Sequence, residues 1–208
     1  TTNVYVAKDA SNQNQWVMIE GQTRPFLWSE YSTNINNLHQ LQLMAVDLTK
    51  NYTVHHNIDA TATNGVNISD MWSTAGFSPI GNSSNRFTGK FDGLNHTISD
   101  LTINRPSQDY VGLFGATNNS TIQNIGLIQA NVRGSWRVGA LIGEANYTNT
   151  SNAFSTGLVN GSRAVGGLVG RNRNQSSILS SYSNAQVTAT DSFAGGLSGV
   201  NQSDSRIE

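Results

Sequence analysis

A glycine-rich segment recurs in the second half of the chain, and this repeat constrains the fold more than any other feature. The copies read VGLFG, VGALIG, VGGLVG and AGGLSG, and they begin at positions 111, 138, 165 and 194, in steps of 27, 27 and 29 residues. A polar, Asn-rich stretch and two further apolar clusters follow each copy. A period of this length is typical of solenoids, in which each repeat is one supersecondary unit.

A single repeat holds too few apolar side chains to form a core of its own. In the second copy they are Val138, Leu141 and Ile142, with Val132 closing the preceding period. Stacked copies bury such side chains in a continuous column while their backbones pair with the repeats on either side. Glycine permits positive φ at a corner and close approach of neighbouring backbones. The sequence therefore predicts an all-β fold, a right-handed parallel β-helix, provided that the four glycine-rich segments lie in register.

The two halves of the chain differ in regularity. We expect residues 107–208 to form repeats of about 27–29 residues per coil, continuing a solenoid begun by less regular coils with loop extensions in residues 1–106. Within that first part, Val4–Val6 and Trp16–Ile19 predict strands of a further coil in the same stack. Residues 87–103 predict two strands around a turn at Asp92-Gly93 and then an alternating strand.

One segment in the first half has helical rather than β periodicity. Ile35, Leu38, Leu41 and Met44 are spaced to face one side of a helix covering roughly residues 36–44. Ser32 or Thr33 is the expected N-cap. We expect this short helix to cover one side of the solenoid.

Composition excludes several classes of function. Charged residues make up 12% of the chain, about half the usual share, and the net charge is -1. Such a chain offers no electrostatic basis for binding nucleic acid, and no apolar run approaches the roughly 18 residues needed for membrane insertion. The chain contains no cysteine, as is typical of a long exported bacterial protein. It stops partway through a repeat, so we expect a fragment of a larger, secreted or surface-exposed protein, monomeric in isolation.

Five segments in a fixed order resemble the module that introduces GLUG repeats in large bacterial surface proteins. They are Tyr52 to Asp59, GFSPIG from Gly76, FTGKFDG from Phe87, HTISDLTI from His96 and VGLFG from Val111, and the later VGGLVG segments resemble the GLUG motif itself. With INNLHQLQLM from Ile35 upstream, the chain is similar to exoproteins of two-partner secretion. This group includes filamentous-haemagglutinin-type proteins and the high-molecular-weight adhesins. The resemblance covers roughly residues 30 to 208.

This resemblance implies three properties. The full-length protein would be exported through an outer-membrane transporter partner, would fold as a right-handed β-helix and would attach to host cells. Because GLUG repeats also occur in surface proteases and other cell-wall proteins, the resemblance is more specific for fold than for function.

Asn-x-Ser/Thr sequons are abundant, and they are possible sites of N-glycosylation. Some high-molecular-weight adhesins carry sugars on such sequons, which favours modification, whereas Asn, Ser and Thr are also frequent simply because they form turns. The sequons begin at Asn51, Asn67, Asn82, Asn95, Asn118, Asn119, Asn146, Asn149, Asn160, Asn174 and Asn201.

No motif predicts a catalytic site, a metal site or a cofactor. Strand alternation places His55 and Asp59 on one face and His56 on the other, whereas a closed zinc site normally needs four ligands. Between Val111 and Val200 the only acids are Glu144 and Asp191, which lie two repeats apart. Carbohydrate-active β-helices need converging carboxylates, so we expect no enzyme activity.

Three residues are the candidates for ligand contact. Trp136 lies in a turn-like setting between Gly134-Ser135 and Arg137, so we expect an exposed ring that could stack on a sugar. The other tryptophans are expected to pack within the irregular half. Arg133 and Arg137, with Arg163, Arg171 and Arg173, fall in the repeats and predict a mild basic patch suited to sialylated or sulfated glycans.

Three functions remain open. The chain could be an adhesin fragment that binds a host-cell glycan or glycoprotein, a rigid stalk without a ligand of its own, or a carbohydrate-active enzyme. The non-repeating loops in the first half, such as residues 60–75, favour recognition because a stalk has little need of them.

Overall fold

The fold is described from a computed structural model, which describes residues 4–8, 13–19, 23–65 and 71–208. The chain forms one α-helix, three short 3-10 helices and eighteen β-strands within those ranges. The elements, in chain order, are β1 (Val4–Lys8), β2 (Asn14–Ile19), β3 (Phe26–Leu27), η1 (Trp28–Glu30), β4 (Asn34–Ile35), α1 (Leu38–Leu43), η2 (Met44–Val46), β5 (Tyr52–Val54), β6 (Ile58–Asp59), η3 (Thr61–Asn64), β7 (Lys90–Ser99), β8 (Thr102–Asn104), β9 (Phe114–Asn118), β10 (Thr121–Arg133), β11 (Trp136–Gly139), β12 (Ile142–Asn146), β13 (Asn149–Gly166), β14 (Val169–Arg173), β15 (Ser177–Leu179), β16 (Tyr182–Gly195), β17 (Ser198–Asn201) and β18 (Arg206–Ile207).

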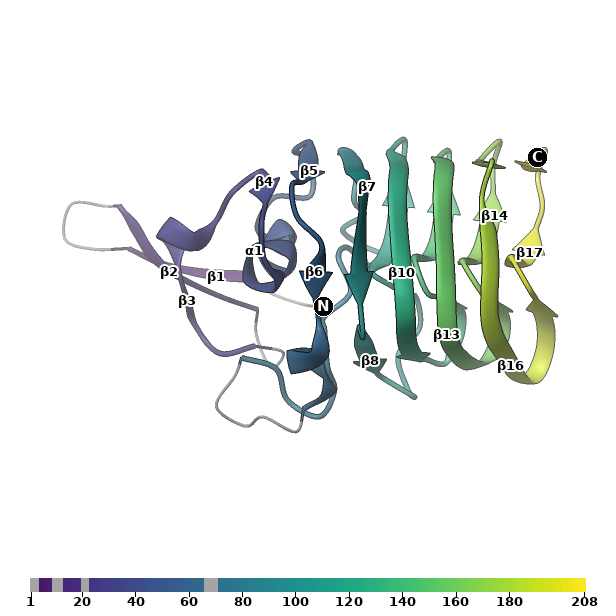
Figure 1. The fold of residues 1–208 in the computed structure, drawn as a ribbon, viewed down its shortest axis with the longest axis horizontal. Helices are drawn as coiled ribbons and strands as arrows, with labels where there is room; N and C mark the ends of the chain where they lie inside the picture. Colours follow the sequence, from purple (N-terminus) through teal and green to yellow (C-terminus); the bar gives the residue numbers. More distant parts are fainter. Residues whose placement is uncertain (1–3, 9–12, 20–22, 66–70) are drawn as a thin grey trace.

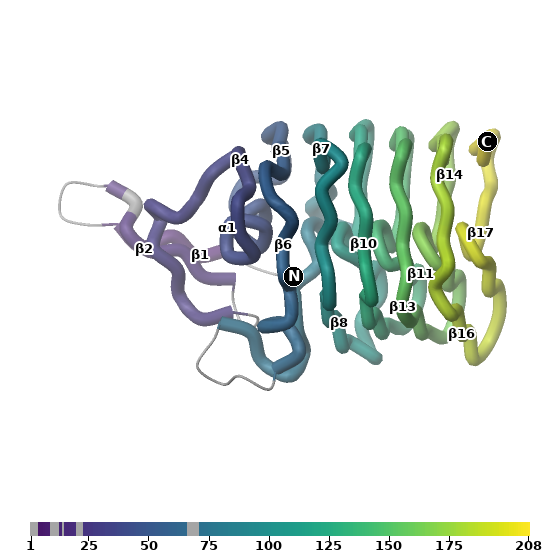
Figure 2. The backbone as a smooth tube through the Cα atoms, in the orientation of Figure 1, coloured from purple at the N-terminus to yellow at the C-terminus, as the bar shows by residue number. Residues whose placement is uncertain are grey.

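The repeats form a parallel β-helix, as predicted. Strands β7, β10, β13 and β16 lie side by side in an eleven-stranded sheet, and β9, β12, β14 and β17 form a second sheet of four strands. In Figure 1 the strands of the first sheet run downward at the front and the chain returns upward behind them as it advances toward the C-terminus, so the coils are right-handed. The tube in Figure 2 shows the same coils stacked one against the next.

The glycine-rich segments lie in register, which was the condition set by the sequence. Val111 pairs with Val138, and Val138 pairs in turn with Val165. Val165 then pairs with Ala194 in the next coil. The prediction of a stacked column is therefore confirmed at the positions on which it depended.

Glycine is required in this register because adjacent backbones approach very closely. A Cβ added at Gly139 would lie 2.4 Å from the Ile142 carbonyl oxygen and 2.6 Å from the Gly170 nitrogen. Such distances are impossible for real side chains, so the backbone itself would have to shift. Close approach, rather than positive φ, explains glycine at this position.

The strands are longer and more bent than the three short segments expected in each repeat. Strand β13 runs over 18 residues and includes three residues with positive φ, at Asn152, Gly157 and Ala164. The predicted turn at Asp92-Gly93 is wrong, because both residues lie inside the continuous strand β7. The chain bends just after them, at Leu94 and Asn95, which have φ values of 48° and 65°. A corner between parallel coils uses the same turn-forming residues as a hairpin, and the sequence alone did not separate the two.

The core is aromatic near the first coils and becomes smaller and more polar along the column. Phe87 pairs in register with Thr117, which pairs with Ala145, and Ala145 pairs with Asn172. Phe87 packs against Phe114 with ring centroids 5.0 Å apart. The buried Thr117 hydroxyl instead lies 2.8 Å from the Thr148 hydroxyl, so these two hydroxyls are hydrogen-bonded to each other as burial demands.

The first strands do not form a coil of the stack, which corrects the prediction for Val4–Val6 and Trp16–Ile19. Strands β1, β2 and β3 form a separate antiparallel sheet. Figure 1 shows this sheet at the N-terminal end of the column, beyond β4. Alternation of apolar residues is the same in parallel and antiparallel strands, so it could not show which partner these strands have.

The predicted helix is present but shorter than expected, and its cap differs. Helix α1 begins after Asn37, whose side chain accepts a 2.9 Å hydrogen bond from the Gln40 nitrogen, so neither Ser32 nor Thr33 is the N-cap. The helix lies at the N-terminal end of the column rather than along its side (Figure 1). Its buried Gln42 accepts hydrogen bonds from the Trp72 indole and from the Ser78 nitrogen, which joins the helix to the first coils.

Candidate functional site

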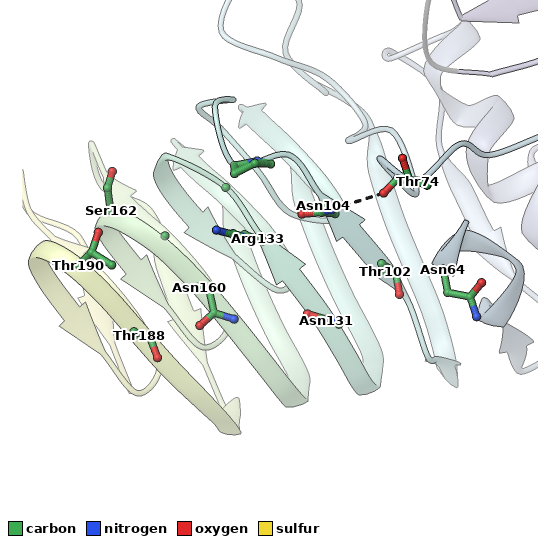
Figure 3. A pocket seen from close by; sticks show the side chains of 13 residues that line it. Asn64, Thr74, Thr102, Asn104, Asn131, Arg133, Asn160, Ser162, Thr188 and Thr190 are labelled. Atoms are coloured by element: carbon green, nitrogen blue, oxygen red, sulfur yellow. Dashed lines mark hydrogen bonds between the residues drawn. The ribbon is translucent and has the colours of Figure 1, made fainter. Parts of the chain in front are cut away.

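A polar groove of about 730 Å³ crosses several successive coils on one flank of the column. Its floor is formed by side chains at one register position, where Asn104 pairs with Arg133, Arg133 with Asn160, and Asn160 with Thr188. Figure 3 shows these side chains on adjacent strands, with Asn131 and Thr102 in the neighbouring row. We call this the polar groove. Because its rows follow the β-ladder, its polar groups recur at the inter-strand spacing of about 4.8 Å.

The donors in the polar groove are available to a ligand. Within the described part of the chain, the side chains of Arg133, Asn131 and Asn160 have no hydrogen-bond or ion-pair partner in the protein. Arg133 contributes five N–H donors in a planar fork, and each Asn contributes both donors and an acceptor. The lining contains no carboxylate and no histidine among the described residues. The polar groove can therefore bind hydroxyl-rich or anionic groups but lacks an acid–base pair.

A buried arginine supports the edge of the polar groove. Arg105, which follows Asn104, is 7% exposed and donates hydrogen bonds to the Phe77 and Gly76 carbonyl oxygens. Burial lowers the pKa of the Arg105 guanidinium to about 10. These bonds hold the segment after Thr74, another groove residue, against the coil that carries Asn104.

A second polar cluster lies on the four-stranded sheet, where four guanidinium groups surround one carboxylate. Glu144 is 1% exposed. Its carboxylate lies 2.8 Å from Arg86 Nη2, 2.9 Å from Arg137 Nε, 3.2 Å from Arg171 Nη1 and 3.4 Å from Arg173 Nε. We call these five residues the Glu144 cluster. Register explains part of it, because Glu144 pairs directly with Arg171 one coil later.

The structure corrects the expectation for Arg137. Its residue exposure is 8%, and its side chain reaches into the Glu144 cluster rather than toward solvent. Burial is the main cause that lowers the pKa of the Arg137 guanidinium, and the Glu144 carboxylate opposes that shift. Arg137 is therefore a structural cation and is not placed to contact a ligand directly.

Trp136 is half-buried in strand β11 and is not the exposed turn residue that the sequence suggested. Its ring lies over the Arg137 guanidinium, 3.5 Å from carbon to ring centroid, and Arg163 lies 5.7 Å from the same ring. Its backbone nitrogen donates to Asp109 Oδ1 at 3.2 Å. The ring is held in one orientation by arginines while part of it stays accessible.

The predicted basic patch is divided between different places. Arg137, Arg171 and Arg173 meet in the Glu144 cluster, which Arg86 also joins from outside the repeats. Arg163 lies beside Trp136, and Arg133 lies in the polar groove. The sequence reasoning missed the role of Glu144, although Arg171 follows it by one repeat period of 27 residues.

The sequons differ in how accessible their amides are, and their occupancy stays a prediction. Asn146 is 8% exposed, and it donates from Nδ2 to the Asn118 side chain while accepting from Asn174. The remaining described sequon residues are exposed at Asn51, Asn95, Asn119, Asn149 and Asn201, and half-buried at Asn82, Asn118, Asn160 and Asn174. Asn67 lies outside the described residues.

The histidines and acids considered from sequence have ordinary local partners. His55 Nε2 lies 2.9 Å from the Thr53 hydroxyl, and His56 Nδ1 lies 3.1 Å from the Asn36 side-chain oxygen. Asp59 accepts a hydrogen bond from the Thr61 nitrogen. In residues 4–8, 13–19, 23–65 and 71–208, no three metal-ligating side chains gather, and no helix has the length and apolar character to cross a membrane.

Comparison with known proteins identifies the repeat type. Residues 161–188 match the GLUG motif. The chain is 34% identical to halomucin of Haloquadratum walsbyi over 185 residues, which are 75% of this chain and 2% of halomucin. It is 34% identical to an immunoglobulin A1 protease of Streptococcus sanguinis over 55% of this chain and 6% of that protein. The chain thus spans a small part of the relatives it matches, and its repeat at residues 161–188 is of the GLUG type.

A solved structure supports the fold. A Bacteroides ovatus protein described as a putative immunoglobulin A1 protease superposes with a TM-score of 0.55, covering 84% of this chain and 63% of that one. The sequence identity is 19%, so this likeness concerns the fold alone.

Proposed function

We propose that this chain is a glycan-recognition segment of a large secreted or cell-surface adhesin, and that it attaches to host cells through the polar groove. The observation that carries the proposal is the row of Asn104, Arg133, Asn160 and Thr188 at one register position across four coils. The size of the relatives and the GLUG motif are consistent with a repetitive surface protein.

The row of side chains suits an extended ligand. Side chains in register repeat at a constant spacing along the column, so a linear glycan can present successive hydroxyls to successive coils. Binding sites of this kind use a few well-placed polar groups to orient the ligand. Arg133 supplies the one full charge in the described lining, which favours hydroxyl clusters or an acidic substituent.

We propose that this segment is not itself catalytic, although two similar proteins are described as proteases. Glycoside hydrolysis needs two converging carboxyl groups, whereas the described lining of the polar groove contains none. The one buried carboxylate in the described repeats, Glu144, is bound by four arginines and has an exposure of 1%, so it is not accessible to a substrate.

Binding to host cells and to a glycan array tests the proposal. The wild-type chain should bind saturably, and binding to cells should fall after enzymatic removal of surface sugars. Arg133→Gln combined with Asn160→Ala should weaken binding by at least about tenfold, since hydrogen bonds to charged groups are worth about 1.5–3 kcal/mol each. Arg206→Gln is the matched control, because the Arg206 side chain is 63% exposed and lies outside the groove. If the double variant binds as tightly as the wild type, the polar groove is not the binding site.

A rigid stalk is the second candidate, and the parallel pairing of each coil with the next along the column favours it. A stalk should show no saturable binding to any cell or glycan.

We further propose that the chain is monomeric and that the full-length protein is exported through an outer-membrane transporter partner. Light scattering of the purified chain tests the first of these, and a dimer mass would contradict it.

A further inference from the structure

Five side chains on the flank next to the polar groove form a stack in which aromatic rings and guanidinium groups alternate. The order is Tyr110, Arg137, Trp136, Arg163 and Phe193, drawn from four successive coils. Arg137 lies 4.5 Å from the Tyr110 centroid and 3.5 Å from that of Trp136. Arg163 lies 5.7 Å from the Trp136 centroid and 5.2 Å from that of Phe193. Each ring thus faces a cation, and each cation lies between two rings.

The two cations of the stack differ in what else they contact. Arg137 is buried and reaches Glu144. Arg163 is exposed, and within the described ranges its guanidinium has no hydrogen-bond or ion-pair partner. Its five N–H donors are therefore oriented by Trp136 and Phe193 but left unused by the protein.

A cavity of about 390 Å³ opens beside Arg163. Its lining includes the Trp136 and Phe193 rings, Arg163, Arg171 and Gln202. Arg171 also contacts Glu144, but that carboxylate is shared with Arg86, Arg137 and Arg173. Four positive charges thus face one negative charge in the cluster that Arg171 shares with this cavity. Asp109, near Arg137, offsets part of the excess and is not in the lining.

We propose that this cavity is a subsite for the sulfate or carboxylate group of an acidic glycan. Arg163 and Arg171 hold the oxyanion through charge-assisted hydrogen bonds, and the Phe193 ring, which is 54% exposed, packs against the sugar ring. The proposal rests on the glycan-binding function and adds the charge class of the ligand. A neutral sugar would use the aromatic walls but would leave the Arg163 donors unsatisfied, so the subsite discriminates by charge.

Titration with inorganic sulfate tests the subsite without requiring the right glycan. In NMR spectra of the labelled chain, the Arg163 Nε–H and Trp136 indole signals should shift saturably. Arg163→Gln should abolish the Trp136 shift, and it disturbs no ion pair of the Glu144 cluster. Arg206→Gln, at an exposed arginine outside the cavity, should leave the shift unchanged. Shifts spread evenly over all arginines, or a Trp136 shift that persists in Arg163→Gln, would overturn the assignment.

An array of neutral, sialylated and sulfated forms of the same glycan cores then separates the acidic subsite from the proposed glycan recognition by the polar groove. We expect Arg163→Gln to weaken binding of the acidic forms by at least about tenfold and to leave neutral forms unaffected. The sialylated and sulfated arms show whether carboxylate or sulfate is preferred. Binding confined to neutral glycans would overturn the acidic subsite but retain glycan recognition by the groove. Binding to no glycan would remove the proposed function and this inference together.

Discussion

Arg86 and Glu144 are 58 residues apart in sequence, yet Arg86 Nη2 donates a 2.8 Å hydrogen bond to Glu144 Oε1. Arg86 lies just before the repeats and Glu144 lies inside them. The contact therefore joins the irregular half of the chain to the regular column. A buried carboxylate is stable only when its charge is compensated, and here the compensation comes from both halves.

Replacement of Glu144 should be among the most destabilising substitutions in the chain. Glu144→Gln removes the one negative charge among four guanidinium groups, and breaking a buried ion pair of this kind costs about 3–5 kcal/mol. Urea unfolding should show this as a lower midpoint. Glu208→Gln is the control, since its pair with Arg206 is exposed and such pairs contribute about 0–1 kcal/mol. Equal stability of the two variants would contradict a stabilising role for the Glu144 cluster.

The stacking of backbones predicts opposite effects at two glycines of the same motif. Gly139→Ala would place a Cβ within 2.4 Å of a carbonyl oxygen, whereas a Cβ at Gly196 meets no atom within 4 Å. We expect Gly139→Ala to reduce the free energy of unfolding by about 1–3 kcal/mol through overpacking. Gly196→Ala should leave it unchanged or slightly higher. Thermal unfolding followed by circular dichroism makes the comparison, and similar losses in both variants would show that close packing is not the cause.

Asp92 should make stability depend on acid pH. Partial burial raises the pKa of its carboxyl, but hydrogen bonds from Asn124, the Leu94 nitrogen and Gln123 outweigh burial and hold the pKa below the ordinary 3.8. Since the folded-state pKa is the lower one, this stabilisation is complete above pH 3.8 and is lost as the pH falls through the folded-state value.

The measurement is the melting temperature of the wild type and of Asp92→Asn between about pH 7 and pH 2. The wild type should be more stable at neutral pH by about 1.5–3 kcal/mol, the worth of a hydrogen bond to a charged group. The difference should shrink only in the most acidic samples. A difference that is constant over the whole range would show that the ionised carboxylate is not the stabilising form.

Glycosylation should follow the accessibility of the sequons. Asn51, Asn95 and Asn119 are exposed. The Asn146 amide instead donates a hydrogen bond to the Asn118 side chain of the neighbouring coil. A glycan on Asn146 would replace that hydrogen bond and would not fit between coils. We therefore expect glycopeptide mass spectrometry of the native protein to find sugars at the exposed sites and an unmodified Asn146. Full occupancy of Asn146 in folded protein would contradict this expectation.

The sequence predicted the column because its determinants are local and periodic. The 27-residue steps between Val111, Val138 and Val165 translate directly into pairing between coils. The antiparallel sheet of β1 to β3 was not predictable in the same way. Its strands have no repeat to indicate a partner, and alternation alone fits either direction.

The candidate site could be predicted in part. Arg133 and Trp136 were identified from sequence, and they line two different cavities, the polar groove and the cavity beside Arg163. The burial of Arg137 was not predicted. Glu144 has no second acid near it in the repeats, and that pattern of acids does not reveal that its partners are arginines. The repeat period of 27 residues places Arg171 beside Glu144. Arg86 lies outside the repeats, so no periodicity indicates that it contacts Glu144.

The valine ladder from Val111 through Val138 to Val165 also sets a rule for how such a protein can change in length. Each additional coil requires about 27 residues and extends the column by one inter-strand step of about 4.8 Å. Gain or loss of a whole repeat therefore alters reach in small, equal increments and leaves neighbouring contacts intact. Extra residues inside a coil cannot lengthen the column at all, and they must emerge sideways as a loop.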